Sequence, residues 1–427
     1  IPGAYLTTDI DEEVHMILEG KLAEMMVLTA PEVYRTYVTT SKNGKPTLYV
    51  KLKKALYGCL RSALLFWRKL SGGMIKDGFV LNPYDACVAN KEINGSQCTI
   101  IWHVDDLKIS HNDPKVVDSV LTRLEKLFGK LVTRRGKKHT YLGMDLDFTE
   151  SGSVKVSMID YLKELIVDFP VEIEDSIGTP ARTNSLEINE ENSVYLEEER
   201  AKILHTFVAK LLFVCKRSRP DTQVAVAFLT TRVRKPDEDD WKKLIRLVKY
   251  IKSTVEMKLT LSSNNTNIVK WWVDGSYAVH KDMKSHTGGL MTLGKGCVYG
   301  TSIRQKLNTK SSTESELVAT ADVLPQIIWT SYFLKEQGCR VEKSVLYQDN
   351  QSAIFLEKNG KASSGKRTRH INILYFFIKD RIDKGEVDVV FLSDGRNGRC
   401  FFTKPLQGAK FRKFRKIIMN LADDGDF

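Results

Sequence analysis

The chain has 427 residues, of which 42% are hydrophobic and 28% charged, an ordinary composition for a globular protein with two or three domains. Its net charge of +12 favours a polyanionic partner, most simply nucleic acid, with a solubilising surface as the alternative. Seven dispersed cysteines without C-x-x-C spacing argue against a zinc site or disulfide framework, and no apolar run approaches the roughly 18 residues of a membrane span.

The first part of the chain, to residue 166, alternates helix and strand signals. "EINGSQCTIIWHV" predicts a hairpin with its turn at Asn94 and Gly95. "DLKIS" predicts the returning strand, so Asp105 and Asp106 should lie in a tight turn between two apolar strands. "HTYLGMDLDF" and "GSVKVSM" predict another hairpin that turns near residues 151–153.

The middle of the chain changes character twice. Residues 170–199 are polar and acidic and contain Pro180, which predicts a linker or an exposed crossing segment. Apolar residues at three- and four-residue intervals then predict helices over residues 197–252. From Ile268 onward, the order β-β-β-α-β-α-β predicts a separate mixed α/β layer.

The neighbouring aspartates Asp105 and Asp106 are unusual because the residues around them are apolar. Two like charges in contact raise each other's pKa, and burial adds to the cost of ionisation. A divalent metal would offset this cost, so the pair is a candidate metal site. The other two Asp-Asp pairs lie in charge-rich segments, where a solvated surface is the expected role.

Three carboxylates in the last third could converge. Asp274 ends a strand, and Asp349 ends another strand, where the alternative is a helix N-cap. Glu314 opens a long helix on its core-facing stripe, whereas Glu316 lies three residues after Thr313, the spacing of a capping box. We therefore expect Glu314 to join the cluster and Glu316 to have a structural role. Such a cluster could hold two Mg²⁺ ions for phosphodiester hydrolysis.

Several motifs carry a resemblance to a known family. "LKKALYGCL", "WHVDDLKIS" and "YLGMDLDF" resemble the reverse transcriptase of copia-type LTR retrotransposons. "VDGSYAVH", "SSTESELVA", "YQDNQSAI", "KRTRHINI" and "FFTKPLQG" resemble the RNase H domain that follows it in the same polyprotein. Their order matches across essentially the whole chain.

The resemblance implies an α+β or mixed α/β fold in three parts. Residues 1–166 would form a partial polymerase palm, an antiparallel sheet with helices and without the fingers. Residues 167–262 would form a linker and a helical thumb or connection, and residues 263–427 an RNase H-like domain.

The resemblance also assigns roles to residues. It implies that Asp105 and Asp106 are catalytic metal ligands of the polymerase, and that Asp274, Glu314 and Asp349 are catalytic metal ligands of the RNase H. The implied cofactor is Mg²⁺, with Mn²⁺ as a substitute, in two-metal sites.

Nucleic-acid contacts follow from the same motifs. Tyr57 and Gly58 match the segment near template and incoming nucleotide, and Tyr141 and Gly143 match the region that steadies the primer end. Further implied contacts are made by Arg61, Lys306, Lys310, Lys366, Arg367, Arg369 and His370. The alternative for the basic run at 366–370 is an ordinary solvated loop.

Several positions depart from the family pattern, among them Cys59, Leu60 and Arg61, where many relatives have Leu-Lys-Gln after the glycine. The family's first polymerase aspartate immediately precedes the residues that match "IPGAYL", so a chain that starts at Ile1 is expected to be N-terminally incomplete. Cys400 stands where the family usually has an aspartate, and Asn372 where many relatives have one. Because hard cations select oxygen ligands, Cys400 is expected to lower the rate of RNA hydrolysis.

The leading hypothesis is a reverse transcriptase and ribonuclease H segment of a retrotransposon polyprotein. Its expected partners are RNA template, DNA primer, RNA–DNA hybrid, dNTPs and other polyprotein segments, with no membrane. The family implies a cytoplasmic particle, with a nuclear location as the alternative. The first alternative function is a decayed or co-opted remnant that binds nucleic acid without catalysis. An integrase or transposase core is disfavoured, because it would leave the motifs upstream of Asp274 unexplained.

Overall fold

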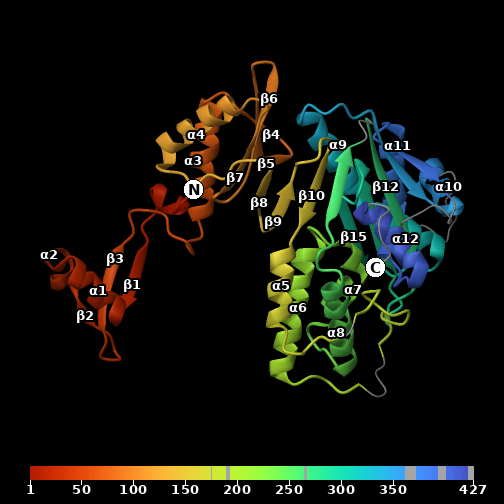
Figure 1. Cartoon of the computed structure of the whole chain (residues 1–427), viewed down its shortest axis with the longest axis horizontal. Helices are drawn as coiled ribbons and strands as arrows, with labels where there is room; N and C mark the ends of the chain where they lie inside the picture. The colour runs from red at the N-terminus through yellow and green to blue at the C-terminus, as the bar shows by residue number, and fades with distance from the viewer. Residues whose placement is uncertain (175, 189–192, 264–266, 361–371, 393–400, 422–427) are drawn as a thin grey trace. The chain divides into compact units, whose positions relative to one another are not determined.

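The computed structural model describes the chain except for residues 175, 189–192, 264–266, 361–371, 393–400 and 422–427 (Figure 1). It forms two compact units, Ile1–Arg134 and Arg135–Phe427, which we call the N-terminal and C-terminal units. Both combine helices with β-sheets, so the expected mixed α/β class is confirmed. The three-part division at residues 166 and 262 stays a prediction.

The N-terminal unit contains two antiparallel sheets, one with the strand order β1-β3-β2 and one with the order β4-β5-β6-β7. Its elements are η1 (Ala4–Thr7), β1 (His15–Glu19), α1 (Lys21–Thr29), α2 (Pro31–Tyr34), η2 (Arg35–Tyr37), β2 (Thr39–Thr40), β3 (Pro46–Lys51), α3 (Ser62–Lys76), β4 (Val80–Asn82), β5 (Asp85–Ile93), β6 (Ser96–His103), β7 (Asp106–Ser110) and α4 (Pro114–Phe128).

The β5–β6–β7 region follows the sequence prediction closely. Asn94 and Gly95 both have positive φ, 53° and 73°, which is the geometry of a two-residue hairpin turn with the right twist. The second predicted turn lies between β6 and β7, directly at the aspartate pair. Helix α4 begins after Asp113, whose side chain caps it, and buries one face on this core through Val116, Val120, Leu124 and Phe128.

The C-terminal unit contains a five-stranded antiparallel sheet, a helical core and a five-stranded mixed sheet. Its elements are β8 (Lys138–Tyr141), β9 (Met144–Asp147), β10 (Ser153–Ser157), α5 (Ile159–Asp168), α6 (Glu198–Cys215), η3 (Pro220–Thr222), α7 (Gln223–Arg232), α8 (Glu238–Ser253), β11 (Leu259–Ser263), β12 (Ile268–Ser276), β13 (His286–Thr292), β14 (Gly294–Lys295), β15 (Tyr299–Arg304), α9 (Ser312–Glu336), β16 (Lys343–Gln348), α10 (Gln351–Asn359), α11 (Asn372–Asp383), β17 (Val387–Phe391) and α12 (Gly408–Met419).

The antiparallel sheet of this unit has the order β14-β11-β10-β9-β8. The predicted hairpin between β9 and β10 is present, but "HTYLGMDLDF" does not form one continuous strand. It turns at Leu142 and Gly143, whose φ values are 51° and 77°, and forms an additional hairpin of β8 and β9. Two consecutive residues with positive φ make a tight turn between paired strands, and this signal outweighs the alternation of apolar residues.

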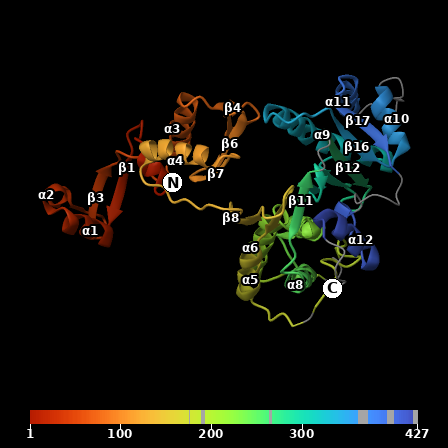
Figure 2. The same cartoon turned by 45° about the horizontal axis from the view of Figure 1, so that its top comes forward.

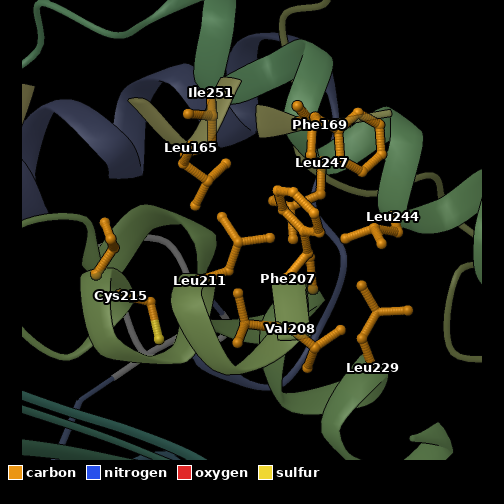
Figure 3. Packing of buried hydrophobic residues seen from close by; sticks show 14 of the residues in the cluster. Leu165, Phe169, Phe207, Val208, Leu211, Cys215, Leu229, Leu244, Leu247 and Ile251 are labelled. Carbon is orange, nitrogen blue, oxygen red and sulfur yellow. The ribbon is translucent and has the colours of Figure 1, made fainter. Parts of the chain in front are cut away.

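Helices α5 to α8 pack around a shared apolar core, as predicted from the spacing of residues 197–252. Figure 3 shows Leu165 of α5 and Phe169, which directly follows α5, meeting Phe207 and Leu211 of α6, with Leu247 of α8 beside them. Fully burying each large apolar side chain of this kind contributes roughly 1.5–3 kcal/mol.

A buried ion pair lies at the junction between α6 and α7. The Arg219 guanidinium donates two hydrogen bonds to the Asp221 carboxylate at 2.9 and 2.7 Å, and neither side chain is exposed. The Tyr250 hydroxyl donates to the same carboxylate at 2.6 Å, and Arg219 also donates to the backbone carbonyl of Thr254 at 3.0 Å. This network ties the η3 turn to the end of α8.

The mixed sheet has the order β15-β13-β12-β16-β17. Strand β12 pairs antiparallel with β13 and parallel with β16, and β16 pairs parallel with β17. Helix α9 packs against β12 and β13, and α10 and α11 pack against each other beside it (Figure 2). The predicted order β-β-β-α-β-α-β is found in β12, β13, β15, α9, β16, α10 and β17, and the structure adds the two-residue strand β14, helix α11 before β17 and helix α12 after it.

Helix α9 is long and apolar enough to cross a membrane by length and composition, the one such helix in the described part of the chain. It is instead the central helix of this layer, with Leu317, Val323, Leu324 and Ile327 buried on the sheet. A core helix satisfies the same length and hydropathy criteria as a membrane span.

Candidate metal centre

Three carboxylates meet at one edge of the mixed sheet. Asp274 lies near the end of β12, Asp349 directly follows β16, and Glu316 lies in the first turns of α9. One ligand oxygen from each lies within 4.8 Å of the other two. Because β12 and β16 are neighbouring parallel strands, their carboxyl ends reach the same edge, where open α/β sheets bind their ligands.

Gly275 allows Glu316 to approach Asp274. A Cβ atom at position 275 would lie 2.5 Å from the backbone oxygen of Ser315, so only glycine lets α9 pack this closely on β12. The Gly275 N–H donates a hydrogen bond of 2.9 Å to Oε2 of Glu316. The backbone of the strand therefore holds one carboxylate of the cluster.

Thr403 orients a second carboxylate. Its hydroxyl donates a hydrogen bond to Oδ2 of Asp274, and its side chain is fully buried. Residue 403 is brought here by packing on β13, because a Cβ at Gly288 would contact its methyl group at 2.6 Å. The sequence contained "FFTKPLQG" as a motif, but nothing in its spacing assigned a role to Thr403.

The expected roles of Glu314 and Glu316 are reversed in the structure. The N-cap of α9 is Ser311, whose hydroxyl accepts a hydrogen bond from the Glu314 N–H at 3.2 Å. The Glu314 carboxylate accepts from the Lys310 N–H at 2.7 Å, so Glu314 is the residue that stabilises the helix start. The structure brings Glu316, and not Glu314, into the cluster with Asp274, because the N-cap of α9 is Ser311, two residues before the assumed cap Thr313. A catalytic role of Glu314 stays a prediction.

Asp349 does not serve as the helix cap that the sequence left open. Asn350 caps α10, accepting a hydrogen bond of 2.9 Å from the Ala353 N–H. Asp349 is therefore placed by the end of β16 and half-buried beside Asp274 and Glu316.

The composition of the cluster suits a divalent cation. Three carboxylates this close repel one another, and a cation between them would offset the repulsion. Oxygen ligands from Asp and Glu are the set that Mg²⁺ and Mn²⁺ prefer. Two of the three, Asp274 and Glu316, are only 4% and 6% exposed, so bulk water screens them poorly.

In the N-terminal unit, Asp105 lies in the predicted turn and Asp106 is the first residue of the strand that follows it. Val104 has a φ of 55°, Asp105 is half-buried, and Asp106 is exposed at the start of β7. No third acidic, histidine or cysteine side chain joins them within ligand distance in the described ranges. The role of the pair in holding metal stays a prediction.

Tyr57 lies close enough to Asp105 for the carboxylate charge to affect the pKa of the tyrosine hydroxyl. Partial burial raises the pKa of the Tyr57 hydroxyl, and the nearby Asp105 carboxylate and Tyr5 raise it further. The Tyr57 ring is half-exposed and lies 4.3 Å from that of Tyr5, measured between centroids. The structure therefore brings together two residues that the motifs assigned separately to the polymerase site.

The other candidate nucleic-acid contacts are scattered. Gly58 follows Tyr57 with a φ of 94°, and Arg61 forms an ion pair of 2.7 Å with Asp11. Tyr141 is buried and Gly143 lies in the β8–β9 turn.

Two exposed lysines, Lys306 and Lys310, lie on the segment that leads into α9. Five further predicted positions lie outside the described residues: Lys366, Arg367, Arg369, His370 and Cys400.

Comparisons with known proteins agree with these motifs. The chain is 26% identical over 427 residues to the retrovirus-related Pol polyprotein from transposon TNT 1-94 of Nicotiana tabacum, covering 97% of this chain and 31% of that protein. It is 26% identical over 404 residues to the Pol polyprotein from transposon RE1 of Arabidopsis thaliana, covering 94% of this chain and 26% of that protein. The chain thus spans about a third or less of the curated relatives. No family model matches it.

A solved structure shares the fold. It is the foamy viral protease-reverse transcriptase in complex with an RNA/DNA hybrid, with a TM-score of 0.50 at 12% identity. The likeness covers 99% of this chain and 48% of that protein. The predicted fold class is confirmed by this likeness together with the mixed α/β architecture.

Proposed function

We propose that this chain, whose homologues are Pol polyproteins of plant transposons, is a reverse transcriptase and RNase H segment whose C-terminal unit hydrolyses RNA in an RNA–DNA hybrid. The observation that carries the proposal is the convergence of Asp274, Glu316 and Asp349 at the carboxyl edge of the mixed sheet. The half-exposed Asp349 would face the solvent side, where a phosphodiester can enter.

Divalent cations held by these carboxylates would activate a water molecule and stabilise the leaving oxygen in an in-line displacement. The residues of this chain supply the positions. The Gly275 N–H and the Thr403 hydroxyl fix the carboxylates of Glu316 and Asp274 before any ligand arrives. Fixed ligands lower the cost of reorganisation when the substrate binds. Lys306 and Lys310 are exposed beside the start of α9 and would contact phosphates of the hybrid.

For the N-terminal unit we propose the polymerase part of the same segment. Asp105 in the β6–β7 turn and Asp106 at the start of β7 would hold metal for nucleotide addition, and Tyr57 beside Asp105 would contact the incoming dNTP or template. The RNA template, DNA primer and other polyprotein segments are the proposed partners, in a cytoplasmic retrotransposon particle. A remnant that only binds nucleic acid is the second candidate, and Cys400 at a family carboxylate position is the feature that favours it.

The purified chain is expected to cleave end-labelled RNA annealed to DNA in the presence of Mg²⁺, and chelation by EDTA should stop the reaction. Asp274→Asn should abolish cleavage because it removes one charge from the cluster. Asp388→Asn is the matched control, since Asp388 lies on β17 of the same sheet and pairs with Lys343 instead. Denaturing gel electrophoresis of the labelled RNA gives the readout.

Two results would contradict this proposal. Cleavage that survives in Asp274→Asn would assign the activity to another site or a contaminant. Absence of cleavage, with the hybrid still retarded on a native gel, would favour the binding remnant. A Cys400→Asp variant that then gains cleavage would identify the responsible position.

A further inference from the structure

A buried glutamate lies in α10, the helix that follows Asp349, and has no part in the chemistry proposed above. Glu357, in α10, is 0% exposed, which is rare for glutamate unless it is paired. Its two carboxyl oxygens accept no hydrogen bond from any side chain or backbone group in the described ranges. An ionised carboxylate in this position would be strongly disfavoured.

The polar side chains beside Glu357 are Thr320 of α9 and Gln348 at the end of β16. Burial raises the pKa of Glu357 to about 8, although the neighbouring Thr320 and Gln348 side chains and the charge of Lys358 oppose the rise. Burial therefore favours the neutral carboxylic acid over the carboxylate at position 357, and a carboxylic acid has an O–H to donate.

The side-chain amide of Gln348 uses its N–H groups, but its oxygen has no hydrogen-bond donor among the described residues. Its Nε2 donates to the Thr320 hydroxyl oxygen at 3.0 Å and to the backbone carbonyl of Glu316 at 3.4 Å. Its Oε1 is buried and accepts no hydrogen bond among the described residues. A buried acid without an acceptor thus lies beside a buried amide oxygen without a donor.

Gln348 is also joined to two members of the metal centre. It directly precedes Asp349 in the chain, and its amide contacts the backbone of Glu316. Gln305 makes a similar contact from the other side, donating a hydrogen bond of 2.9 Å to the carbonyl of Ser315. Two buried glutamine amides therefore hold the turn of α9 that carries Glu316.

We propose that Glu357 donates a hydrogen bond from its carboxylic O–H to Oε1 of Gln348, and so acts as a positioning residue that fixes Glu316 and Asp349 in the geometry of the metal centre. The inference deepens the proposed nuclease function and rests on it for the identity of the ligand. The bond fixes the orientation of the Gln348 amide. Its Oε1 then accepts from Glu357, while its Nε2 donates to the Thr320 hydroxyl and the Glu316 carbonyl of α9. No proton leaves Glu357 during the reaction, so its role is indirect.

The test compares two variants of the full chain. Glu357→Leu fills a similar volume and removes the donor, whereas Glu357→Gln keeps an N–H donor for Gln348. Loss of partners that orient metal ligands commonly lowers metal affinity by about 10- to 100-fold. We therefore expect Glu357→Leu to weaken Mn²⁺ binding by calorimetry in this range and to lower kcat for hybrid cleavage more than it changes KM. Glu357→Gln should stay within a few-fold of wild type.

A second readout uses metal-free protein and does not depend on activity. Amide hydrogen exchange, followed by mass spectrometry in peptides that cover residues 315–320 and 346–350, should be about tenfold faster in Glu357→Leu and unchanged in Glu357→Gln. Thr330→Val is the matched control, because Thr330 is a buried residue of α9 whose hydroxyl lacks a partner in the described part of the chain. It should alter neither exchange at these peptides nor Mn²⁺ affinity.

The outcomes separate this inference from the proposed function. Unchanged exchange and Mn²⁺ affinity in a folded Glu357→Leu protein would overturn the positioning role. Equal losses in Glu357→Leu and Glu357→Gln would overturn it as well, since a donor would then not suffice. A wild-type chain that binds no Mn²⁺ would refute the metal centre, yet the exchange measurement would still decide whether Glu357 orders this turn.

Discussion

Glu316→Gln is expected to lower RNA cleavage by at least about a hundredfold, whereas Glu314→Gln should leave it within a few-fold of wild type. Glutamine keeps the size of the side chain but removes the negative charge. At position 316 the lost charge belongs to the cluster with Asp274 and Asp349. At position 314 the side chain accepts from the Lys310 N–H, and a glutamine oxygen fills this role equally well.

The two variants differ by two residues on one helix turn, so they control for each other. Initial rates on an RNA–DNA hybrid at saturating Mg²⁺, together with Mn²⁺ affinity from calorimetry, give the comparison. Thermal unfolding of both proteins should stay near wild type. Equal loss in both variants would mean that the start of α9, and not one carboxylate, sets the activity. Loss in Glu314→Gln alone would restore the assignment made from the sequence.

Asp221→Ala is expected to lower the free energy of unfolding by about 3–5 kcal/mol. The substitution leaves the Arg219 guanidinium buried at 0% exposure without its carboxylate, and it removes the acceptor of the Tyr250 hydroxyl. A buried charge that loses its partner costs more than the pair contributed when intact. Urea unfolding of the full chain, followed by far-UV circular dichroism, measures the change.

The control for this prediction is Asp239→Ala. Asp239 pairs with Lys243 at 2.8 Å on the surface of α8 and is 52% exposed. Exposed pairs contribute about 0–1 kcal/mol, so this variant should unfold close to wild type. Similar small losses in both variants would indicate that water or a rearranged arginine compensates for the missing Asp221 carboxylate.

The sequence predicted the elements that depend on local signals. The Asn94-Gly95 turn and the turn at Asp105 were both placed correctly, because only a few residue types suit a tight turn. Most of the order of strands and helices after Ile268 was also predicted, since each of these elements has its own apolar period, but β14, α11 and α12 were not.

The candidate site was predicted in type but not in every member. The start of α9 offers Ser311, Ser312 and Thr313 as possible caps, and the choice among them decides which glutamate faces the strand. Composition cannot make this choice, because all three residues are good caps. The packing of α9 on Gly275 determines which residue caps the helix and therefore which glutamate faces the strand.

Thr403 and Glu357 could not be found from the sequence for a different reason. Thr403 reaches the centre from a segment 129 residues after Asp274, and Glu357 lies beside Gln348 from helix α10. Neither position has an unusual local pattern in the sequence. Their contribution depends on burial and on unpaired hydrogen-bonding groups, which exist only after β12, β16 and α9 have assembled.

The close approach of α9 to Gly275 has a consequence for how genetic data on this chain would be interpreted. An alanine at position 275 would push the helix and Glu316 away from Asp274, so cleavage would disappear although no carboxylate had changed. In a screen of random variants for loss of cleavage, substitutions of this glycine would have effects as large as substitutions of the acidic residues. A position that performs no chemistry would then have the mutational signature of a catalytic one, because it sets the distance between those that do.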